Sequence, residues 1–188
     1  MSVILGVIPF THIEDDKIIY EYLLSIKDNP HVEIAQHGTY HTQSEIFNLT
    51  EDETYKLAKI GKDKLYDLLK INPVTFIPPN NEYNDNSTFP LSELGFKYLS
   101  AGNQYWDNLY DTRMYRVGYS TATKYGNNGA ITPDTQVISD CKESLDATNF
   151  CLVLFHPQDY DNRGLDSFKN ILDGLLKLNA TTKTFGSK

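Results

Sequence analysis

The fold of this chain is decided by the stretch Val32-Glu33-Ile34-Ala35-Gln36-His37-Gly38-Thr39-Tyr40-His41. Its apolar first half predicts a short strand at residues 32–35, and this strand leads directly into two histidines spaced four residues apart. In α/β folds, chemistry lies where strands end and loops begin. If residues 37–41 form a helical turn, both imidazoles project from one face with Cβ atoms roughly 5–6 Å apart, which suits one metal ion. The alternative is a chance spacing of two inert surface histidines.

Strands and helices alternate on both sides of this stretch. Apolar runs and helical spacing predict strands at 3–8, 74–77, 96–100, 115–119 and 150–155, and helices at 17–27, 50–70, 89–94, 133–146 and 165–178. The first strand is expected to be buried on both faces. The alternation predicts parallel β-α units, in which the loops after the strands share one face. We therefore expect five loops to converge: 8–16, 37–41, 78–84, 100–103 and 156–160.

The composition indicates a single globular domain over residues 1–188, large enough to bury a core. Its 17 basic and 25 acidic residues give a formal charge of -8, and no basic stripe is present. Nucleic acid and anionic membranes are therefore not expected as partners. Neither a signal peptide nor a transmembrane segment is predicted, so a cytoplasmic location is expected unless an N-terminal segment is missing.

The chain has two cysteines. Cys141 falls in a predicted helix, and Cys151 begins an apolar run that predicts a buried strand. Because cysteine behaves as a small hydrophobic residue, buried free thiols are expected here rather than a disulfide.

The predicted loops carry histidines, amide side chains and an aspartate, which are suited to metal binding, proton transfer or ligand binding. Two imidazoles and one oxygen ligand leave an open position on a zinc-like ion, whose bound water has a pKa of about 7. His156, which closes an apolar run, is the candidate general acid; alternatively it is a strand-end histidine bonded to backbone. The amides of residues 78–84 suit a polar ligand, although a simple loop would look similar. Asp159 would orient an imidazole; alternatively it is a helix cap or a solvated loop acid.

The order of four motifs resembles the polysaccharide deacetylases, the carbohydrate esterases of family 4. The motifs are E-I-A-x-H leading into HxxxH, F-x-P-P at residues 76–79, E-L-G-F-K at 93–97 and L-F-H-P-Q-D at 154–159. The likeness covers roughly residues 3–160 and is closest to a small divergent branch. It implies an α/β fold of the incomplete, distorted (β/α) barrel type. It also implies hydrolysis of acetyl groups on a carbohydrate, with one divalent metal, expected to be zinc, held by one Asp and two His.

Carried over residue by residue, the resemblance makes His37 and His41 the metal ligands and His156 the general acid. It implies that an acetylated carbohydrate contacts residues of the Pro-Pro and His-Pro-Gln-Asp motifs, namely Pro79, Asn84, Gln158 and Asp159. Ile77 stands where many members of the family have an arginine.

The chain departs from the family at its start. The family's first strand ends in paired aspartates, a base and a metal ligand, and it precedes the strand that matches residues 3–8. The chain is therefore expected to lack the first β-α unit. One explanation is that the chain is shortened. A second is that Asp15, Asp16 or His12 substitutes, with Asp15 the candidate base, whereas helix capping is the ordinary explanation for the two aspartates. The third alternative is a carbohydrate-binding or scaffold relative without catalysis. A missing strand would expose an edge that a homo-oligomer or rearranged helices would cover.

Overall fold

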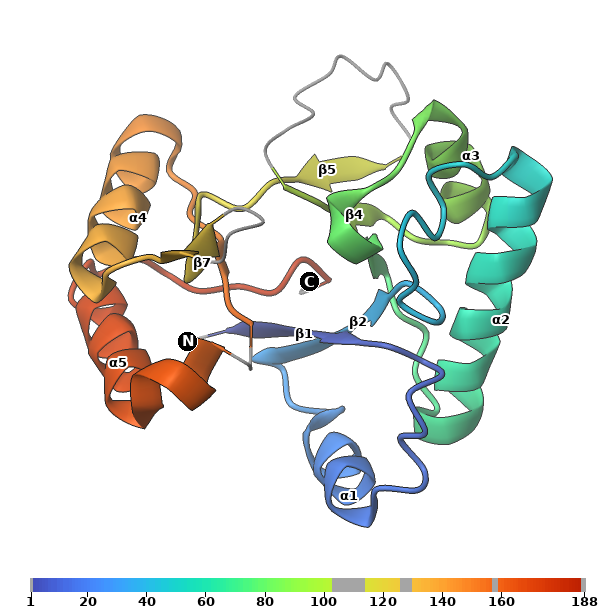
Figure 1. The fold of residues 1–188 in the computed structure, drawn as a ribbon, viewed down its shortest axis with the longest axis horizontal. Helices are drawn as coiled ribbons and strands as arrows, with labels where there is room; N and C mark the ends of the chain where they lie inside the picture. Colours follow the sequence, from blue (N-terminus) through green and yellow to red (C-terminus); the bar gives the residue numbers. More distant parts are fainter. Residues whose placement is uncertain (1, 103–113, 126–129, 157–158, 187–188) are drawn as a thin grey trace. The chain divides into compact units, whose positions relative to one another are not determined.

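The computed structural model describes residues 2–102, 114–125, 130–156 and 159–186 (Figure 1). The chain forms two compact units, Met1–Val117 with Thr182–Lys188, and Gly118–Thr181. The single domain expected over residues 1–188 stays a prediction.

The first unit is built on a parallel five-stranded sheet. Its strands lie in the order β1-β2-β3-β4-β5, so each new strand adds to the same edge. The strands are β1 (Val3–Val7), β2 (Val32–His37), β3 (Thr75–Ile77), β4 (Tyr98–Ser100) and β5 (Tyr115–Val117). Within the described residues the sheet is open rather than closed into a barrel, which confirms the predicted α/β fold of the incomplete-barrel type.

The helices of this unit are α1 (Lys17–Ile26), α2 (Glu51–Leu69), the short 3-10 turn η1 (Pro79–Asn81) and α3 (Asp85–Glu93). Capping side chains determine where the three α-helices begin. The Asp16 carboxylate accepts hydrogen bonds from the first turn of α1, so this residue is a helix cap. Thr50 and Glu53 form a reciprocal capping box at the start of α2. Helix α3 begins four residues before its predicted start because Asn84 and Ser87 cap it.

Strand β1 differs from the prediction that it is buried on both faces. In the described sheet it pairs with β2 alone, so it is an edge strand, and Val3 is 43% exposed. The prediction was wrong because a run of apolar residues does not reveal how many neighbours a strand has. The homo-oligomer expected to cover such an edge stays a prediction.

Different segments of the chain pack on the two faces of the sheet. Helices α1 and α2 pack on one face through a core cluster that includes Ile34, Leu65 and Leu69. Side chains alternate along a strand, so Glu33 and His37 of β2 both lie on the opposite face, at its amino and carboxyl ends. The C-terminal segment 182–186 covers the amino end of that face. There the backbone N–H of Gly186 donates to Glu33 Oε2 at 2.7 Å, and Phe185 stacks on a tyrosine of β4.

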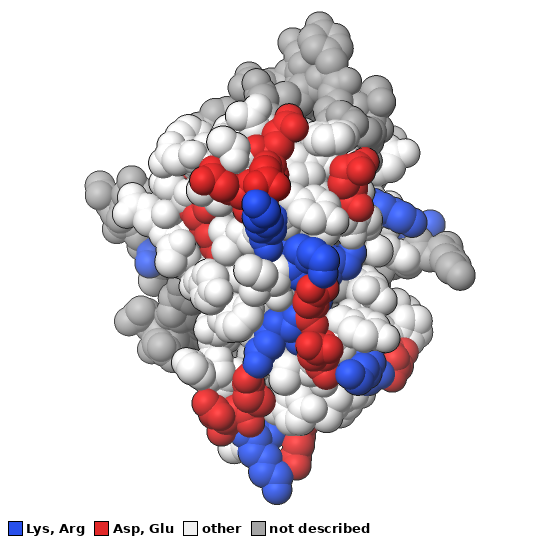
Figure 2. Space-filling view, turned by 90° about the vertical axis from the view of Figure 1, so that its right-hand side faces the viewer, with Lys and Arg blue, Asp and Glu red and all other residues white. Residues whose placement is uncertain are grey.

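Opposite charges are interleaved on the outer side of α2. Figure 2 shows lysine and acidic side chains mixed on this face, with no extended area of one sign. Lys56 pairs with Asp52 and Lys59 pairs with Asp63, each one helical turn apart. This face therefore carries no basic patch for phosphate groups. Among the helices described, none is both long and apolar enough to cross a bilayer.

The second unit joins two helices to short strands. Its elements are β6 (Thr121–Ala122), β7 (Lys124–Tyr125), β8 (Ala130–Ile131), α4 (Asp134–Thr148), β9 (Val153–Leu154) and α5 (Asp159–Leu176). Strands β6 and β9 are parallel, and β7 and β8 are antiparallel. The two helices pack closely at Gly174, where an added Cβ would stand 2.7 Å from Ile138 Cγ1.

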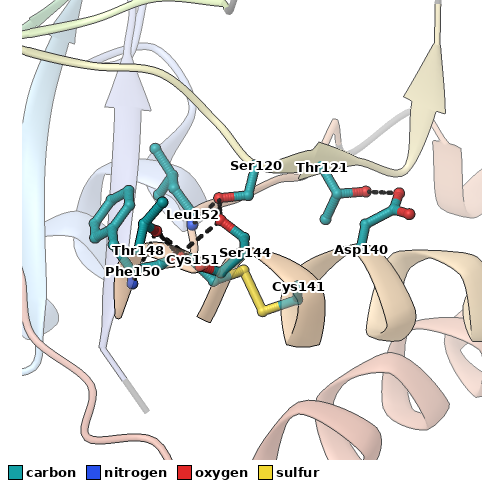
Figure 3. Close-up of a disulfide and its surroundings, with 9 residues drawn as sticks. All are labelled: Ser120, Thr121, Asp140, Cys141, Ser144, Thr148, Phe150, Cys151 and Leu152. Atoms are coloured by element: carbon teal, nitrogen blue, oxygen red, sulfur yellow. Dashed lines mark hydrogen bonds between the residues drawn. A yellow bond between two sulfur atoms is a disulfide. The ribbon is translucent and has the colours of Figure 1, made fainter. Parts of the chain in front are cut away.

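A disulfide joins Cys141 of α4 to Cys151, which corrects the prediction of free thiols (Figure 3). The chain reverses at Asn149, whose left-handed conformation ends α4 and brings the two Cα atoms to 5.4 Å. The Ser144 hydroxyl donates to the carbonyl of Phe150 at 2.8 Å and secures this reversal. Disulfides persist mainly in oxidising compartments, so the cytoplasmic location stays a prediction that this pairing does not support.

Candidate metal and catalytic site

The loops after β1, β2, β3 and β4 meet at the carboxyl end of the sheet. Three hydrogen bonds join successive loops: Phe10 N–H to Thr39 O at 3.2 Å, Gly38 N–H to Ile77 O at 3.0 Å and Gly102 N–H to Asn81 Oδ1 at 2.7 Å. The predicted convergence is therefore confirmed for the loops of the first unit. The fifth loop, 156–160, belongs to the second unit, and its residues 157 and 158 lie outside the described residues.

His37 and His41, the histidine pair, lie side by side at this end of the sheet. Their ring centroids are 4.5 Å apart and the rings meet edge to face at 77°. His37 is the last residue of β2, and its Nδ1 lies 3.0 Å from the carbonyl oxygen of Ile77 at the end of β3. A carbonyl oxygen only accepts, so this contact requires the proton on Nδ1 and directs metal coordination to Nε2.

A tight turn, not the helical turn suggested by the four-residue spacing, brings the two rings together. Gly38 and His41 both have left-handed backbone conformations, with φ of 60° and 59°. A Cβ at Gly38 would collide with the Glu45 carboxylate and stand 2.6 Å from Pro79 Cγ. The glycine is therefore required both by its backbone angle and by its close neighbours.

The histidine pair fits a divalent ion in part. Neutral imidazoles are common zinc ligands, and the His37 ring has the carbonyl partner that typically orients such a ligand. In the parts of the chain that the structure describes, no group of three His, Cys, Asp or Glu residues could hold a metal. Among the described residues, the histidine pair therefore offers two candidate ligands, against the three expected.

The acidic residues after β1 have identifiable partners. Asp15 lies 3.4 Å from Nδ1 of His12, and both side chains are largely exposed, whereas Asp16 is committed to capping α1. The Lys64 ammonium donates a hydrogen bond to Glu14, which lowers the pKa of that carboxyl and ties this loop to α2. The role of Asp15 as a base stays a prediction.

The four expected substrate-binding residues have different positions. Pro79 is buried at the start of η1, beside Gly38. The Asn84 side chain donates to the carbonyl of Phe47 and accepts from the Ser87 hydroxyl at 3.0 Å, so it links the 37–50 loop to α3. Two of the four are not described at the level of side chains: Gln158 lies outside the described residues, and Asp159 is described only as the first residue of α5. Contact of each with substrate stays a prediction.

His156, the predicted general acid, follows β9 in the second unit and is half-buried. The preceding residue, Phe155, packs edge to face against Phe168 of α5, with ring centroids 5.4 Å apart. This contact fixes the end of β9 to the helix that follows. The catalytic role of His156 stays a prediction.

The structure adds two residues that the sequence did not single out. Glu45 is buried, and its carboxylate accepts hydrogen bonds from three successive backbone N–H groups of the histidine loop. Tyr40 lies between the two histidines in the sequence and is 48% exposed. Its ring centroid is 4.9 Å from the ring centroid of Phe10. One acidic residue four positions after a histidine is too common to stand out. The sequence could have pointed to Tyr40 only through its position in the stretch from His37 to His41.

Comparison with known proteins gives matches among solved structures. No protein-family model matches the chain, and no curated protein sequence matches it. A candidate polysaccharide deacetylase from Mycobacterium smegmatis matches with a TM-score of 0.60 and 18% identity, over 100% of this chain and 76% of that one. A family 4 carbohydrate esterase from Streptomyces lividans, solved with acetate, matches with a TM-score of 0.62 and 12% identity, over 94% and 75% of the two chains.

A third match carries the same fold without the activity. It is a CE4 family pseudoenzyme from Bacillus anthracis, with a TM-score of 0.55 and 10% identity, over 90% of this chain and 49% of that one. At these identities the matches establish architecture, and activity has to be argued from the site. The chain has the fold of the polysaccharide deacetylases, the carbohydrate esterases of family 4.

Proposed function

We propose that this protein is a metal-dependent hydrolase that removes acetyl groups from a carbohydrate. The observation that carries the proposal is the histidine pair, whose rings are 4.5 Å apart at the carboxyl end of β2 in a deacetylase fold. Catalytic residues of barrel folds lie at that end of the strands. A pair of neutral imidazoles in that position is suited to a divalent cation.

His37, through its Nε2 atom, and His41 would hold the ion, which is expected to be zinc. When bound, a divalent ion would polarise the acetyl carbonyl and lower the pKa of a water molecule. The Ile77 carbonyl orients the His37 ring for this, and the backbone N–H of His41 donates a hydrogen bond to the Glu45 carboxylate. The third ligand is not provided by the described residues.

Proton transfer is assigned to two other residues. In the proposed reaction, water adds to the carbonyl carbon, the bond from that carbon to nitrogen or oxygen breaks, and acetate is released. His156 would give a proton to the departing amine or hydroxyl group, and Asp15 is the candidate that would take a proton from water. The half-buried position of His156 and the exposed carboxylate of Asp15 are compatible with these roles.

Tyr40 and Phe10 are suited to hold the sugar. An exposed aromatic face packs against the C–H groups of a pyranose ring, and Tyr40 presents such a face next to the histidine pair in sequence. Its ring rests on Phe10, and its backbone N–H donates to Glu45 at 2.8 Å. The ring is therefore held before substrate arrives, which lowers the entropy cost of binding. Contact of Pro79, Asn84, Gln158 and Asp159 with the substrate is part of the same proposal.

The direct test combines metal content with acetate release. Purified protein reconstituted with zinc is expected to bind about one ion, measured by elemental analysis, and to release acetate from acetylated chito-oligosaccharides or an aryl acetate. His37→Ala and His41→Ala should each lose both properties, and His156→Ala should keep zinc but lose most of the turnover. His31→Ala is the matched control, because this histidine is exposed at the other end of β2.

Two results would decide against the proposal. Absence of acetate release together with identical behaviour of His37→Ala would exclude the metal-dependent hydrolase. Glycan binding without turnover would instead identify a catalytically inactive carbohydrate-binding relative, the alternative that the pseudoenzyme of the same fold illustrates.

A further inference from the structure

We infer that Glu45 is the positioning residue of the histidine pair: its carboxylate sets the backbone of residues 39–41 and thereby holds the His41 ring against His37. The inference rests on the proposed function only in treating the pair as a metal site. Glu45 lies in neither the strand nor the motif that contains the histidines.

Three successive backbone donors converge on this carboxylate. Oε1 of Glu45 accepts from the N–H groups of Thr39 and Tyr40, both at 2.8 Å, and Oε2 accepts from the N–H of His41 at 3.0 Å. Consecutive N–H groups that point to one anion form a concave binding site for it, and hydrogen bonds to a charged acceptor are stronger than neutral ones. Only 7% of Glu45 is exposed, so little water competes for these donors.

The loop needs such an anchor because its backbone is strained. His41 has φ of 59°, a conformation that a residue with a side chain adopts at a cost unless its surroundings hold it. The bond from its own N–H to Glu45 is the contact that holds it. Without that bond, the His41 backbone is expected to relax to negative φ and to move its ring away from His37.

Packing places the Glu45 carboxylate next to the turn. A Cβ on Gly38 would overlap Glu45 Oε2, so carboxylate and turn are in direct contact. Glu45 itself does not form a three-residue metal group with the histidines among the described residues, and its oxygens face the loop donors. It therefore acts on the metal site through His41.

The variant that tests this role is Glu45→Gln in the full-length chain. An amide has one accepting oxygen, so its NH₂ group would face a backbone donor and at least one of the three bonds would be lost. Residues that orient metal ligands typically change metal affinity by 10–100-fold when removed, so zinc affinity measured by calorimetry should fall about tenfold or more. The cobalt-substituted protein should show an altered visible spectrum, and Glu45→Asp should recover part of the affinity.

Glu33→Gln is the matched control. Glu33 is also a carboxylate that accepts a backbone N–H, from Gly186 at 2.7 Å, but it lies at the amino end of β2. This variant is expected to lower the melting temperature while zinc affinity stays within about twofold, since no metal ligand depends on Glu33. An equal loss of zinc affinity in both variants would mean that Glu45 contributes only general stability, and would overturn the inference.

A second measurement does not depend on the metal. In wild-type protein the amides of residues 39–41 should be protected from hydrogen exchange, and Glu45→Gln should remove this protection while Glu33→Gln keeps it. If wild-type protein binds no zinc, the proposed function fails, and this measurement still decides the role of Glu45. Unchanged protection in Glu45→Gln would overturn the inference whatever the zinc result.

Discussion

The two ends of the sheet in the first unit use similar residues in different ways. At the amino end of β2, the Glu33 carboxylate accepts from the Thr75 hydroxyl and from the backbone of Gly186, so the chain itself satisfies it. At the carboxyl end of the same face lies His37, which meets the ring of a second histidine. Both ends also carry an aromatic pair: Tyr98 with Tyr115 at the amino end, and Phe10 with Tyr40 at the carboxyl end.

The difference lies in how the strained backbone is packed and in what covers each end. At the carboxyl end, the positive-φ turn at Gly38 and His41 packs against the Glu45 carboxylate. At the amino end, the positive-φ Gly95 has an ordinary contact distance around it, and the C-terminal segment 182–186 covers the sheet. Strain that is maintained by surrounding structure is typical of functional sites. In barrel folds, residues at the amino ends of strands mainly serve stability, and those at the carboxyl ends serve chemistry. Glu33 and His37 occupy these two positions within a single strand.

The largest effect is expected for Gly38→Ala at the carboxyl end. The new Cβ would collide with Glu45 and crowd Pro79, at a backbone angle that alanine disfavours. We expect the free energy of unfolding to fall by about 3 kcal/mol and zinc affinity to fall more than tenfold, measured by urea denaturation and calorimetry.

Gly95→Ala is the matched control for this change. Gly95 also has positive φ, but it lies before β4 at the amino end, and an added Cβ there would meet Lys62 Nζ at 3.5 Å, an ordinary contact distance. It should cost about 1 kcal/mol through the backbone angle alone and leave zinc affinity unchanged. A smaller effect at Gly38 than at Gly95 would contradict the packing described for the histidine loop.

An intermediate effect is expected for Phe185→Ala at the amino end. This change removes the ring that stacks on Tyr98 at 5.4 Å and loosens the C-terminal segment 182–186. Stability should fall by about 1–3 kcal/mol, since Phe185 is half-buried rather than fully buried. Zinc affinity and acetate release at 25 °C should not change. Loss of zinc binding in this variant would show that the two ends of the sheet are coupled and not separate in role.

The smallest effect is expected for Tyr40→Ala. Losing one aromatic contact is worth about 0.5–1.5 kcal/mol, so affinity for a chito-oligosaccharide should fall about threefold to tenfold, measured by calorimetry. Hydrolysis of a small aryl acetate should be little affected, because that substrate has no sugar ring to stack. Tyr115→Ala, which removes an exposed tyrosine of the amino-end pair, should leave glycan affinity unchanged. Equal losses in both variants would argue against a specific sugar contact at Tyr40.

Much of the fold was predictable because its signals are local. Thr50 and Glu53 lie three residues apart and cap α2 through their own side chains, so the helix start could be predicted from the sequence. Pro78 and Pro79 ended the third strand where expected, since proline cannot continue the ladder. The meeting of loops at one end of the sheet followed from the parallel strand order.

The features that the sequence did not predict depend on contacts between distant parts of the chain. An apolar run has the same pattern in an edge strand and in a central strand. The exposure of β1 could therefore be known only from the order of the strands in the sheet. The Cys141–Cys151 disulfide depended on the chain reversal after α4. One of the two partners of Glu33, the backbone N–H of Gly186, comes from the C-terminal segment 182–186, which is distant in sequence.

The sequence by itself determined the parallel α/β fold, the helix caps and the place of the histidine pair at the end of β2, because periodicity, capping and strand order are encoded over short distances. Only the tertiary structure decided how the two rings meet. The turn at Gly38, the left-handed backbone of His41 and the three hydrogen bonds to Glu45 lie within one loop and contact one another. A strained loop of this kind is set by packing and by a buried charge, neither of which leaves a periodic signal in the chain.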